Sequence, residues 1–216
     1  MRALTCDRCG APASPTRAAC VYCGAATTAE EDLIVGSSFG DGGGWVLTRE
    51  VRPDLVVDAT SRGRLRVCLG DKHAHPDLVV PVAWLGRSFV DLSVSATMRF
   101  SSPRCDAAAG FWLRAGDGLA LVVLAWDDGR VTVSTNREQR HHRMLSTVAP
   151  SADHDPLRGT RLTVSLIGTK MTVTRDQRPI GSFVVDHLSS GEAELRVQPG
   201  DGAVEVVFSD ALARAR

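Results

Sequence analysis

Residues 89–100 read FVDLSVSATMRF, and this stretch decides the fold class. Its apolar side chains stand at every second position from Val90 to Phe100, and polar or charged side chains stand between them. A period of two residues directs the apolar groups to one face of a pleated strand. The stretch therefore predicts a β-strand with one face in a core.

The same alternation recurs along the rest of the chain. It is found at residues 65–69, 131–133, 162–166, 171–173, 195–197 and 204–208. Residues 119–126, LALVVLAW, are instead continuously apolar, which is typical of a strand covered on both faces. Turn-forming sequences separate the segments, namely Gly168-Thr169, Asp127-Asp128-Gly129 and Pro199-Gly200-Asp201-Gly202. No amphipathic helix pattern is found, so about a dozen short strands predict an all-β protein with two packed antiparallel sheets, in preference to a barrel.

Composition and charge narrow the functional classes. The chain of 216 residues carries 25 basic and 25 acidic residues, so its formal net charge is zero. Such a chain has no long-range field that would gather nucleic acid or anionic lipid, which disfavours strong polyanion binding. A hydrophobic fraction of 44% is ordinary for a chain that buries a core.

The apolar segments are too short for a membrane span. The longest, residues 119–126, is far from the roughly 18 apolar residues that a bilayer requires. The N-terminus goes directly from Met1 into charged and cysteine-containing sequence, without the apolar segment of a signal peptide. The sequence therefore predicts a cytoplasmic protein without a membrane partner.

Four cysteines near the N-terminus form the strongest motif of the chain. Cys6, Cys9, Cys20 and Cys23 make the pattern C-x2-C-x10-C-x2-C, with a glycine after each pair. Two residues between thiolates let a tight turn direct both sulfurs at one ion, and the glycine admits the turn around the metal. Four thiolates suit tetrahedral Zn²⁺ and leave no coordination position for water or substrate. The pattern predicts a zinc ribbon over residues 1–26, with a structural Zn²⁺.

Paired cysteines at this spacing have three other interpretations. Two disulfides fit poorly with a chain that shows no export signal. A redox dithiol would be expected on a strand-to-helix step of a larger fold. Iron in four thiolates uses similar paired turns, so the spacing alone leaves iron open as an alternative to zinc.

The cysteine segment resembles a known kind of module. The sequence from CDRCGAPA to CVYCGA, within residues 3–25, is similar to the short zinc ribbons at the ends of many bacterial proteins. Such ribbons serve in protein docking, nucleic-acid contact or capping. Nucleic-acid binding is disfavoured, because Tyr22 is the one aromatic residue available for stacking and the basic residues are sparse. Residues 27–38, small and then acidic, are predicted to be a linker.

The succession of segments downstream resembles the concanavalin A-like lectin/glucanase superfamily, in its laminin-G-like branch. The resemblance is carried by residues 39–45, 89–94, 109–118, 161–166 with 174–176, and 204–210. It implies a jelly-roll β-sandwich over residues 39–212. Two departures are present: the hairpin turn reads Asp176-Gln177-Arg178 rather than Asn-Gly or Asp-Gly, and Leu119-Ala120 replaces an aromatic residue. The second departure disfavours sugar binding by that strand.

The acidic motif of the superfamily's glycan hydrolases, E-x-D-x-x-E, is absent from the chain. Glu192-Ala193-Glu194 and Asp153-His154-Asp155 stand among glycine, serine and proline, and are interpreted as solvated loops. The histidines His73, His75, His141 and His142 are likewise assigned to exposed loops. These patterns predict that the protein is not an enzyme.

Trp112 and Arg114 are the candidate ligand-binding residues. Alternation places both side chains opposite Phe111 and Leu113, so they face outward if the latter pair faces the core. An exposed tryptophan beside an arginine is a suitable surface site. The alternative interpretation is structural, with a loop packed over Trp112.

The sequence as a whole predicts a non-catalytic binding protein. In this interpretation the ribbon docks on a protein partner and the sandwich recognises another protein or a ligand. The first alternative is a carbohydrate-binding or glycan-hydrolase-related protein. The second is a nucleic-acid adaptor that acts through the ribbon.

Overall fold

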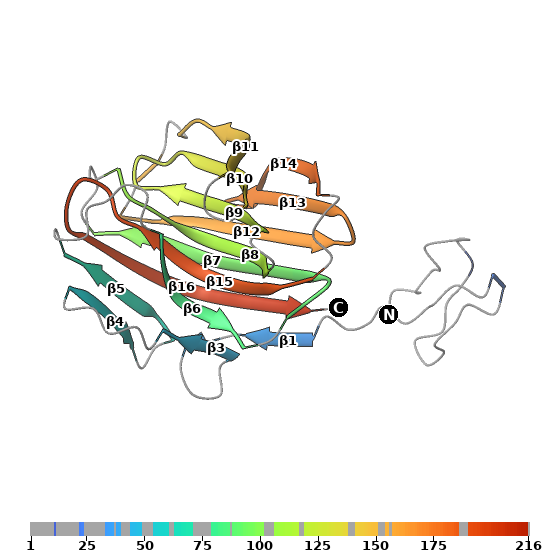
Figure 1. Cartoon of the computed structure of the whole chain (residues 1–216), viewed down its shortest axis with the longest axis horizontal. Coiled ribbons are helices and arrows are strands. Elements are labelled where there is room, and N and C mark those ends of the chain that lie inside the picture. The colour runs from blue at the N-terminus through green and yellow to red at the C-terminus, as the bar shows by residue number, and fades with distance from the viewer. Residues whose placement is uncertain are drawn as a thin grey trace. The chain divides into compact units, whose positions relative to one another are not determined.

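Two β-sheets lie face to face and form the main body of the protein (Figure 1). A computed structural model describes residues 11, 22–23, 33–36, 38–39, 44–48, 54–60, 63–70, 79–86, 88–101, 106–116, 119–137, 141–150, 154–155, 157–185 and 190–215. The chain divides into two compact units, residues 1–33 with residue 216, and residues 34–215. The sandwich is formed by the second unit.

The first sheet follows the spatial order β14-β13-β12-β7-β16-β5-β4, with β1 also paired to β16. Its strands are β14 (Arg178–Val184), β13 (Lys170–Arg175), β12 (Thr160–Ile167), β7 (Leu92–Phe100), β16 (Val204–Ala215), β5 (Leu65–Leu69), β4 (Leu55–Ala59) and β1 (Leu33–Gly36). The long neighbours pair antiparallel, as β7 does with both β12 and β16.

The second sheet follows the order β11-β10-β9-β8-β15-β6-β3-β2. Its strands are β11 (His141–Val148), β10 (Val131–Arg137), β9 (Leu119–Trp126), β8 (Ala108–Gly116), β15 (Glu192–Gln198), β6 (Val80–Leu85), β3 (Gly44–Leu47) and β2 (Ser38–Phe39). The long strands are antiparallel, and the two-residue β2 pairs parallel with β3. Successive strands often lie in different sheets, for example β6 and β7, β7 and β8, and β15 and β16, which gives the predicted jelly-roll sandwich.

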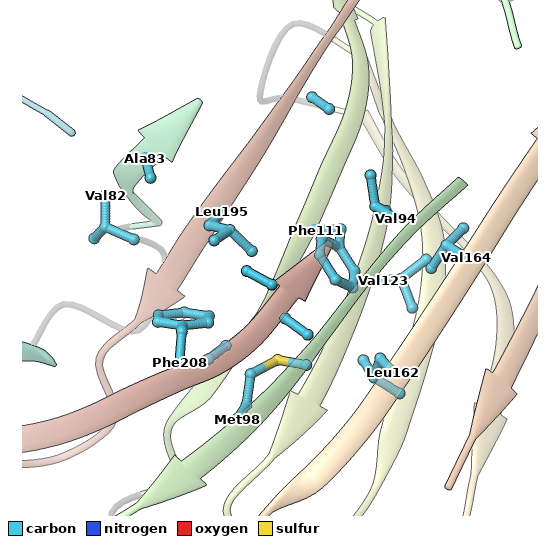
Figure 2. Close-up of a cluster of buried hydrophobic side chains, with 14 of the residues drawn as sticks. Val82, Ala83, Val94, Met98, Phe111, Val123, Leu162, Val164, Leu195 and Phe208 are labelled. Carbon is cyan, nitrogen blue, oxygen red and sulfur yellow. The ribbon is translucent and has the colours of Figure 1, made fainter. Parts of the chain in front are cut away.

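The main core fills the space between the inner faces of the two sheets (Figure 2). Phe111 of β8 and Leu195 of β15 come from the second sheet, whereas Met98 of β7 and Phe208 of β16 come from the first. Phe111, Leu195, Met98 and Phe208 are all fully buried. The alternation in residues 89–100 therefore has the predicted consequence, because the apolar positions of β7 point into this core.

The continuously apolar strand β9 is covered on both faces, as its sequence predicted. Leu121 and Val123 belong to the main core, whereas Val122 and Leu124 belong to a second apolar cluster on the other side of the sheet. All four of these side chains are at most 5% exposed. Strand β9 therefore separates the core from a second buried surface, on which the site described below is built.

The predicted turns are also present. Gly168 and Thr169 join β12 to β13, and Gly129 lies in the turn between β9 and β10 with a φ of 88°. At positive φ a residue without Cβ avoids the steric clash that other residues meet.

Several boundaries differ from the pattern. Strand β1 and the first residue of β2 lie within residues 27–38, which the sequence indicated as a linker. Strand β16 extends to Ala215 rather than ending near residue 212. The described residues of the sandwich form 16 strands, more than the alternation revealed, because short strands such as β2 and β3 have too few residues to show a period. The described residues include no helix long and apolar enough to cross a membrane.

Candidate functional site

A second apolar cluster lies on the outer face of the second sheet, away from the main core. It consists of Ala108, Trp112, Ala120, Val122 and Leu124, with Val79 and Trp126 partly buried against it. Its members come from β8 and β9, at positions that alternate with residues of the main core. The main core between the sheets already holds the sandwich together, so an apolar cluster on the outer face is not required by the fold. This face is therefore the candidate functional site.

Three side chains form a row across the middle of this face. Glu194 of β15 lies opposite Trp112 of β8 on one side and opposite Trp84 of β6 on the other. Directly paired residues of neighbouring strands share a face of the sheet. Adjacent strands lie about 4.8 Å apart. The strands that carry Trp84 and Trp112 are therefore separated by about twice that distance, with Glu194 between them.

A partly buried ion pair adjoins the row. Nε of Arg196 lies 2.6 Å from Oε2 of Glu194, two residues away on the same strand. The guanidinium of Arg196 also lies over the ring of Trp112, 4.1 Å from its centroid. The two charged side chains are only 15% and 14% exposed. The face thus combines apolar rings with a charge pair shielded from water, where polar interactions are stronger than at an open surface.

Strand β10 adds hydrogen-bonding groups to the same face. Thr132, Ser134 and Asn136 lie opposite Leu124, Val122 and Ala120 of the apolar cluster. The Oδ1 atom of Asn136 is buried, and within the described part of the chain no group donates a hydrogen bond to it. A buried acceptor without a donor is costly, so this atom is a suitable contact for a ligand or a water molecule.

The third tryptophan of the face has its polar group satisfied. Nε1 of Trp126 donates to the hydroxyl of Thr132 at 3.0 Å. The guanidinium of Arg130 lies 4.6 Å from the Trp126 ring centroid and pairs with the carboxylates of Asp128 and Asp106. Trp126 is therefore held in place by the protein itself.

Of the two predicted ligand contacts, Trp112 lies on the outer face as alternation indicated. The residue is nevertheless only 7% exposed, because Arg196 lies over its ring and the second apolar cluster packs around it. Sequence alternation predicts the face on which a side chain lies, but it does not show what covers that side chain.

The contacts of Arg114 give this side chain a structural role. A register irregularity between Leu113 and Gly116 interrupts the alternation, and Arg114 takes a φ of 51° and is 3% exposed. Its Nη2 atom donates to the carbonyl oxygens of Val90 at 2.6 Å and Gly168 at 2.8 Å. Burial lowers the pKa of Arg114, although Asp91 opposes the shift. The guanidinium thus connects the end of β8 to two loops, and its role as a ligand contact stays a prediction.

The interpretation of Glu192 and Glu194 as loop residues is wrong. Both lie on strand β15, and their burial alternates with that of the fully buried Ala193 and Leu195. The nearby serine and glycine residues suggested a loop, although the alternation of EAELRVQ was a signal for a strand. His141 and His142 were also assigned to a loop and instead begin strand β11.

Trp84 and Arg196 were not predicted as site residues. Nothing in the local sequence distinguishes them, because their relation to Trp112 depends on the order of strands in the sheet.

The predicted zinc ligands lie almost entirely outside the described residues. Of the four cysteines only Cys23 is described, so the proposed site has no geometry here. His73 and His75 also lie outside the described residues. Across the residues that the structure does describe, no group of three or more histidine, cysteine, aspartate or glutamate side chains is placed to hold a metal.

The architecture defines the class of protein. Two antiparallel sheets in jelly-roll order give this unit the concanavalin A-like β-sandwich fold. No protein-family model and no curated protein matches the sequence.

Solved structures with the same architecture include both binding modules and enzymes. The carbohydrate-binding module CBM66 from Bacillus subtilis superposes with a TM-score of 0.59 at 11% identity, covering 80% of this chain and 96% of that chain. The β-glucanase of Bacillus licheniformis gives a TM-score of 0.61 at 8% identity, over 86% and 98% of the two chains. A prokaryotic β-1,3-1,4-glucanase (lichenase) from a mouse hindgut metagenome gives 0.61 at 10% identity, over 85% and 98%. At such identities the likeness establishes the fold.

These comparisons correct the prediction that the protein is not an enzyme. The sandwich is shared with β-glucanases, so the absence of the E-x-D-x-x-E spacing does not exclude catalysis. The comparisons also favour the carbohydrate alternative over recognition of a protein by the sandwich.

Proposed function

We propose that the outer face of the second sheet binds a carbohydrate. The observation that carries the proposal is the row of Trp84, Glu194 and Trp112 across three adjacent strands. Indole rings offer flat apolar surfaces for the C–H face of a sugar ring, and a carboxylate accepts hydrogen bonds from sugar hydroxyls. The spacing of about two strands between the indoles suits a ligand that lies across the strands.

Arg196 determines which tryptophan is accessible first. Its guanidinium lies over Trp112, whereas Trp84 is less completely buried. We therefore expect a sugar to stack on Trp84 and to hydrogen-bond to the Glu194–Arg196 pair. Stacking on Trp112 requires Arg196 to move away from the ring.

The similarity to known proteins supports the same ligand class. One structural neighbour is described as a carbohydrate-binding module, and others are described as β-glucanases. This chain shares their fold, which supports carbohydrate as the ligand class to test first. The present proposal depends on the residues of this chain, because the likeness itself concerns only the fold.

A glycan array followed by calorimetric titration of the strongest ligand tests the proposal. We expect Trp84→Ala and Glu194→Gln to weaken binding by about tenfold each, since a lost stacking or hydrogen-bonding contact is worth about 1.4 kcal/mol. Glu205→Gln is the matched control, because Glu205 is also paired with an arginine but lies on the first sheet. Absence of glycan binding, or equal weakening by the control, contradicts the proposal.

Hydrolysis of the bound glycan is a second candidate activity. Glu192 and Glu194 lie on one face of β15, two residues apart, and glycosidases commonly use a pair of carboxyl groups on either side of the bond that is cleaved. Release of reducing ends from β-1,3-1,4-glucan, measured for the wild type, Glu192→Gln and Glu194→Gln, tests this activity. If the protein hydrolyses the glucan and either variant retains the full rate, the two glutamates are not the catalytic pair.

For the N-terminal unit we propose a structural zinc ribbon that docks on a protein partner in the cytoplasm. The support is the spacing of Cys6, Cys9, Cys20 and Cys23. Four thiolates close the coordination shell of the ion, which suits a structural rather than a catalytic metal.

A further inference from the structure

A pocket separate from the outer face of the second sheet lies beside the hairpin of β13 and β14. It has a volume of about 270 Å³, and its lining includes Arg158, Arg175, Arg178, His154, Asp155 and Asp176. The turn of the hairpin is joined to the start of β12, since the backbone N–H of Asp176 donates to the carbonyl of Arg161 at 2.8 Å. None of these lining residues belongs to the tryptophan-bearing face.

Among the described residues that line the pocket, arginines outnumber aspartates. In the described portion of the chain, no carboxylate forms a salt bridge with Arg158, Arg175 or Arg178. Elsewhere in the sandwich arginines do pair closely, as Arg66 does with Glu205 at 2.5 Å. Three arginines and two aspartates line the described part of the pocket, so its formal charge without His154 is +1, a balance that favours an anion.

One oxygen of each aspartate in the pocket accepts a hydrogen bond from the backbone. Oδ1 of Asp155 accepts the N–H of Leu157 at 2.9 Å, and Oδ1 of Asp176 accepts the N–H of Arg161 at 2.9 Å. These carboxylates hold the loop and the hairpin in place. Each therefore has a structural role that accounts for its presence among the arginines.

Two of the side chains that line the pocket, Arg175 and His154, are held in position. Nη1 of Arg175 donates to the carbonyls of Gly129 at 3.1 Å and Ala149 at 3.0 Å. Nε2 of His154 lies 3.2 Å from the carbonyl oxygen of Asp127, so this ring nitrogen carries a proton and donates. Groups that are ordered before binding lose less conformational entropy when a ligand arrives.

The geometry points to an oxyanion site in this pocket, for a phosphate or sulfate group that is free or carried on a small molecule. The planar donor fork of arginine matches the oxygens of such groups. The pocket is slightly smaller than the roughly 300–1,000 Å³ of common ligand sites, which favours a small ligand over a polymer. The exposed side chains of Arg158 and Arg178 move toward the bound anion, while Arg175 and His154 form the fixed wall of the pocket.

Calorimetric titration of the full-length protein tests the site. The ligands are sodium phosphate, sodium sulfate, glucose 6-phosphate and glucose, each at ionic strength matched with sodium chloride. We expect saturable binding of the three anions and no binding of glucose at this site. Tighter binding of glucose 6-phosphate than of phosphate identifies a phosphorylated carrier as the source of the group, and equal binding identifies the free anion.

Variants of the two exposed arginines separate this site from general surface charge. Arg158→Gln and Arg178→Gln are each expected to weaken anion binding by about tenfold, the effect of one lost charge-assisted hydrogen bond. Arg143→Gln is the control, because Arg143 is an exposed arginine on β11 outside the pocket. Arg175 is left unchanged, since it bonds two carbonyls. Lack of saturable binding, or equal effects of Arg143→Gln and Arg178→Gln, overturns the inference.

Discussion

At the scale of single residues, the turn between β13 and β14 contains the clearest local strain. Asp176 and Gln177 have φ angles of 50° and 66°, in the left-handed region. A residue with a Cβ atom is less stable there than glycine, by roughly 1–2 kcal/mol. Two-residue hairpins usually place Asn-Gly or Asp-Gly at these positions for that reason.

Gln177→Gly is therefore expected to stabilise the protein. The gain should be about 0.5–1 kcal/mol after allowance for the greater freedom of glycine in the unfolded chain. Urea unfolding measures it as a higher midpoint with an unchanged slope. Gln177→Ala, which keeps the Cβ atom, should produce no comparable gain; an equal increase in both variants would contradict the explanation.

At the scale of elements, the contact between β8 and β9 depends on one small residue. A Cβ atom on Gly110 would lie 2.0 Å from the carbonyl oxygen of Val123, in the neighbouring strand. The two strands would have to separate to admit any side chain there. Strand β8 carries Trp112 and β9 carries Val122, so this separation would also disturb the outer face of the second sheet.

We expect Gly110→Ala to destabilise the protein by about 2–3 kcal/mol, as overpacking of a well-packed interior does. Gly168→Ala is the comparison, since no heavy atom lies within 4 Å of a Cβ atom built at that position. Its cost should be limited to about 1 kcal/mol for a φ of 55°. Thermal and urea unfolding measure the loss of stability in both variants. A larger loss in Gly168→Ala than in Gly110→Ala would contradict the argument.

On the outer face of the first sheet, a polar cluster links β5, β16 and the end of β7. Glu205 of β16 accepts hydrogen bonds from Arg66 at 2.5 Å and from the hydroxyl of Ser101 at 2.9 Å. The hydrogen bond from Arg66 holds the pKa of Glu205 below its ordinary value; partial burial opposes this shift, and the Ser101 hydroxyl reinforces it. The ionised form of Glu205 is thus more stable in the folded than in the unfolded state.

This cluster predicts a pH dependence of stability. Because the folded pKa is depressed, the stabilisation is fully present above the ordinary glutamate pKa of about 4.3 and is lost as the pH falls through the folded pKa. Urea unfolding at pH 7 and pH 3 should therefore show a smaller loss of stability for Glu205→Gln than for the wild type. Arg66→Met should reduce the dependence in the same direction, and a variant with the full wild-type dependence would refute the role of the pair.

At the scale of the whole molecule, the chain divides into residues 1–33 with residue 216, and residues 34–215. All four tryptophans lie in the second of these units. The proposed zinc ligands Cys6, Cys9, Cys20 and Cys23 all lie in the first. Tryptophan emission therefore reports on the sandwich, and thiol reactivity of those cysteines reports on the predicted ribbon.

Removal of metal from the purified protein should affect the two units differently. We expect one zinc ion per chain, whose removal by a strong chelator makes the ribbon thiols reactive toward a disulfide reagent, because thiolates bound to zinc are protected. The tryptophan emission spectrum should stay unchanged. Protein that is purified without metal and has thiols that already react refutes the zinc ribbon. Iron found in place of zinc identifies the site as an iron site. A shifted tryptophan spectrum after metal removal contradicts the expectation that only the first unit responds.

The sequence alone determined the all-β class, most of the long strands and the burial of both faces of β9. These properties follow from the identities of neighbours one or two positions apart, and such short-range patterns are legible along a chain. The same principle assigned Trp112 to the face opposite Phe111.

Only the tertiary structure decided what surrounds Trp112. The row of Trp84, Glu194 and Trp112 joins strands β6, β15 and β8, which are far apart in the chain and adjacent in the sheet. The pocket beside Arg178 likewise depends on a loop and a hairpin that meet only after folding. A local period specifies the direction of a side chain, whereas its neighbours are specified by the order in which strands pair, which no short segment encodes.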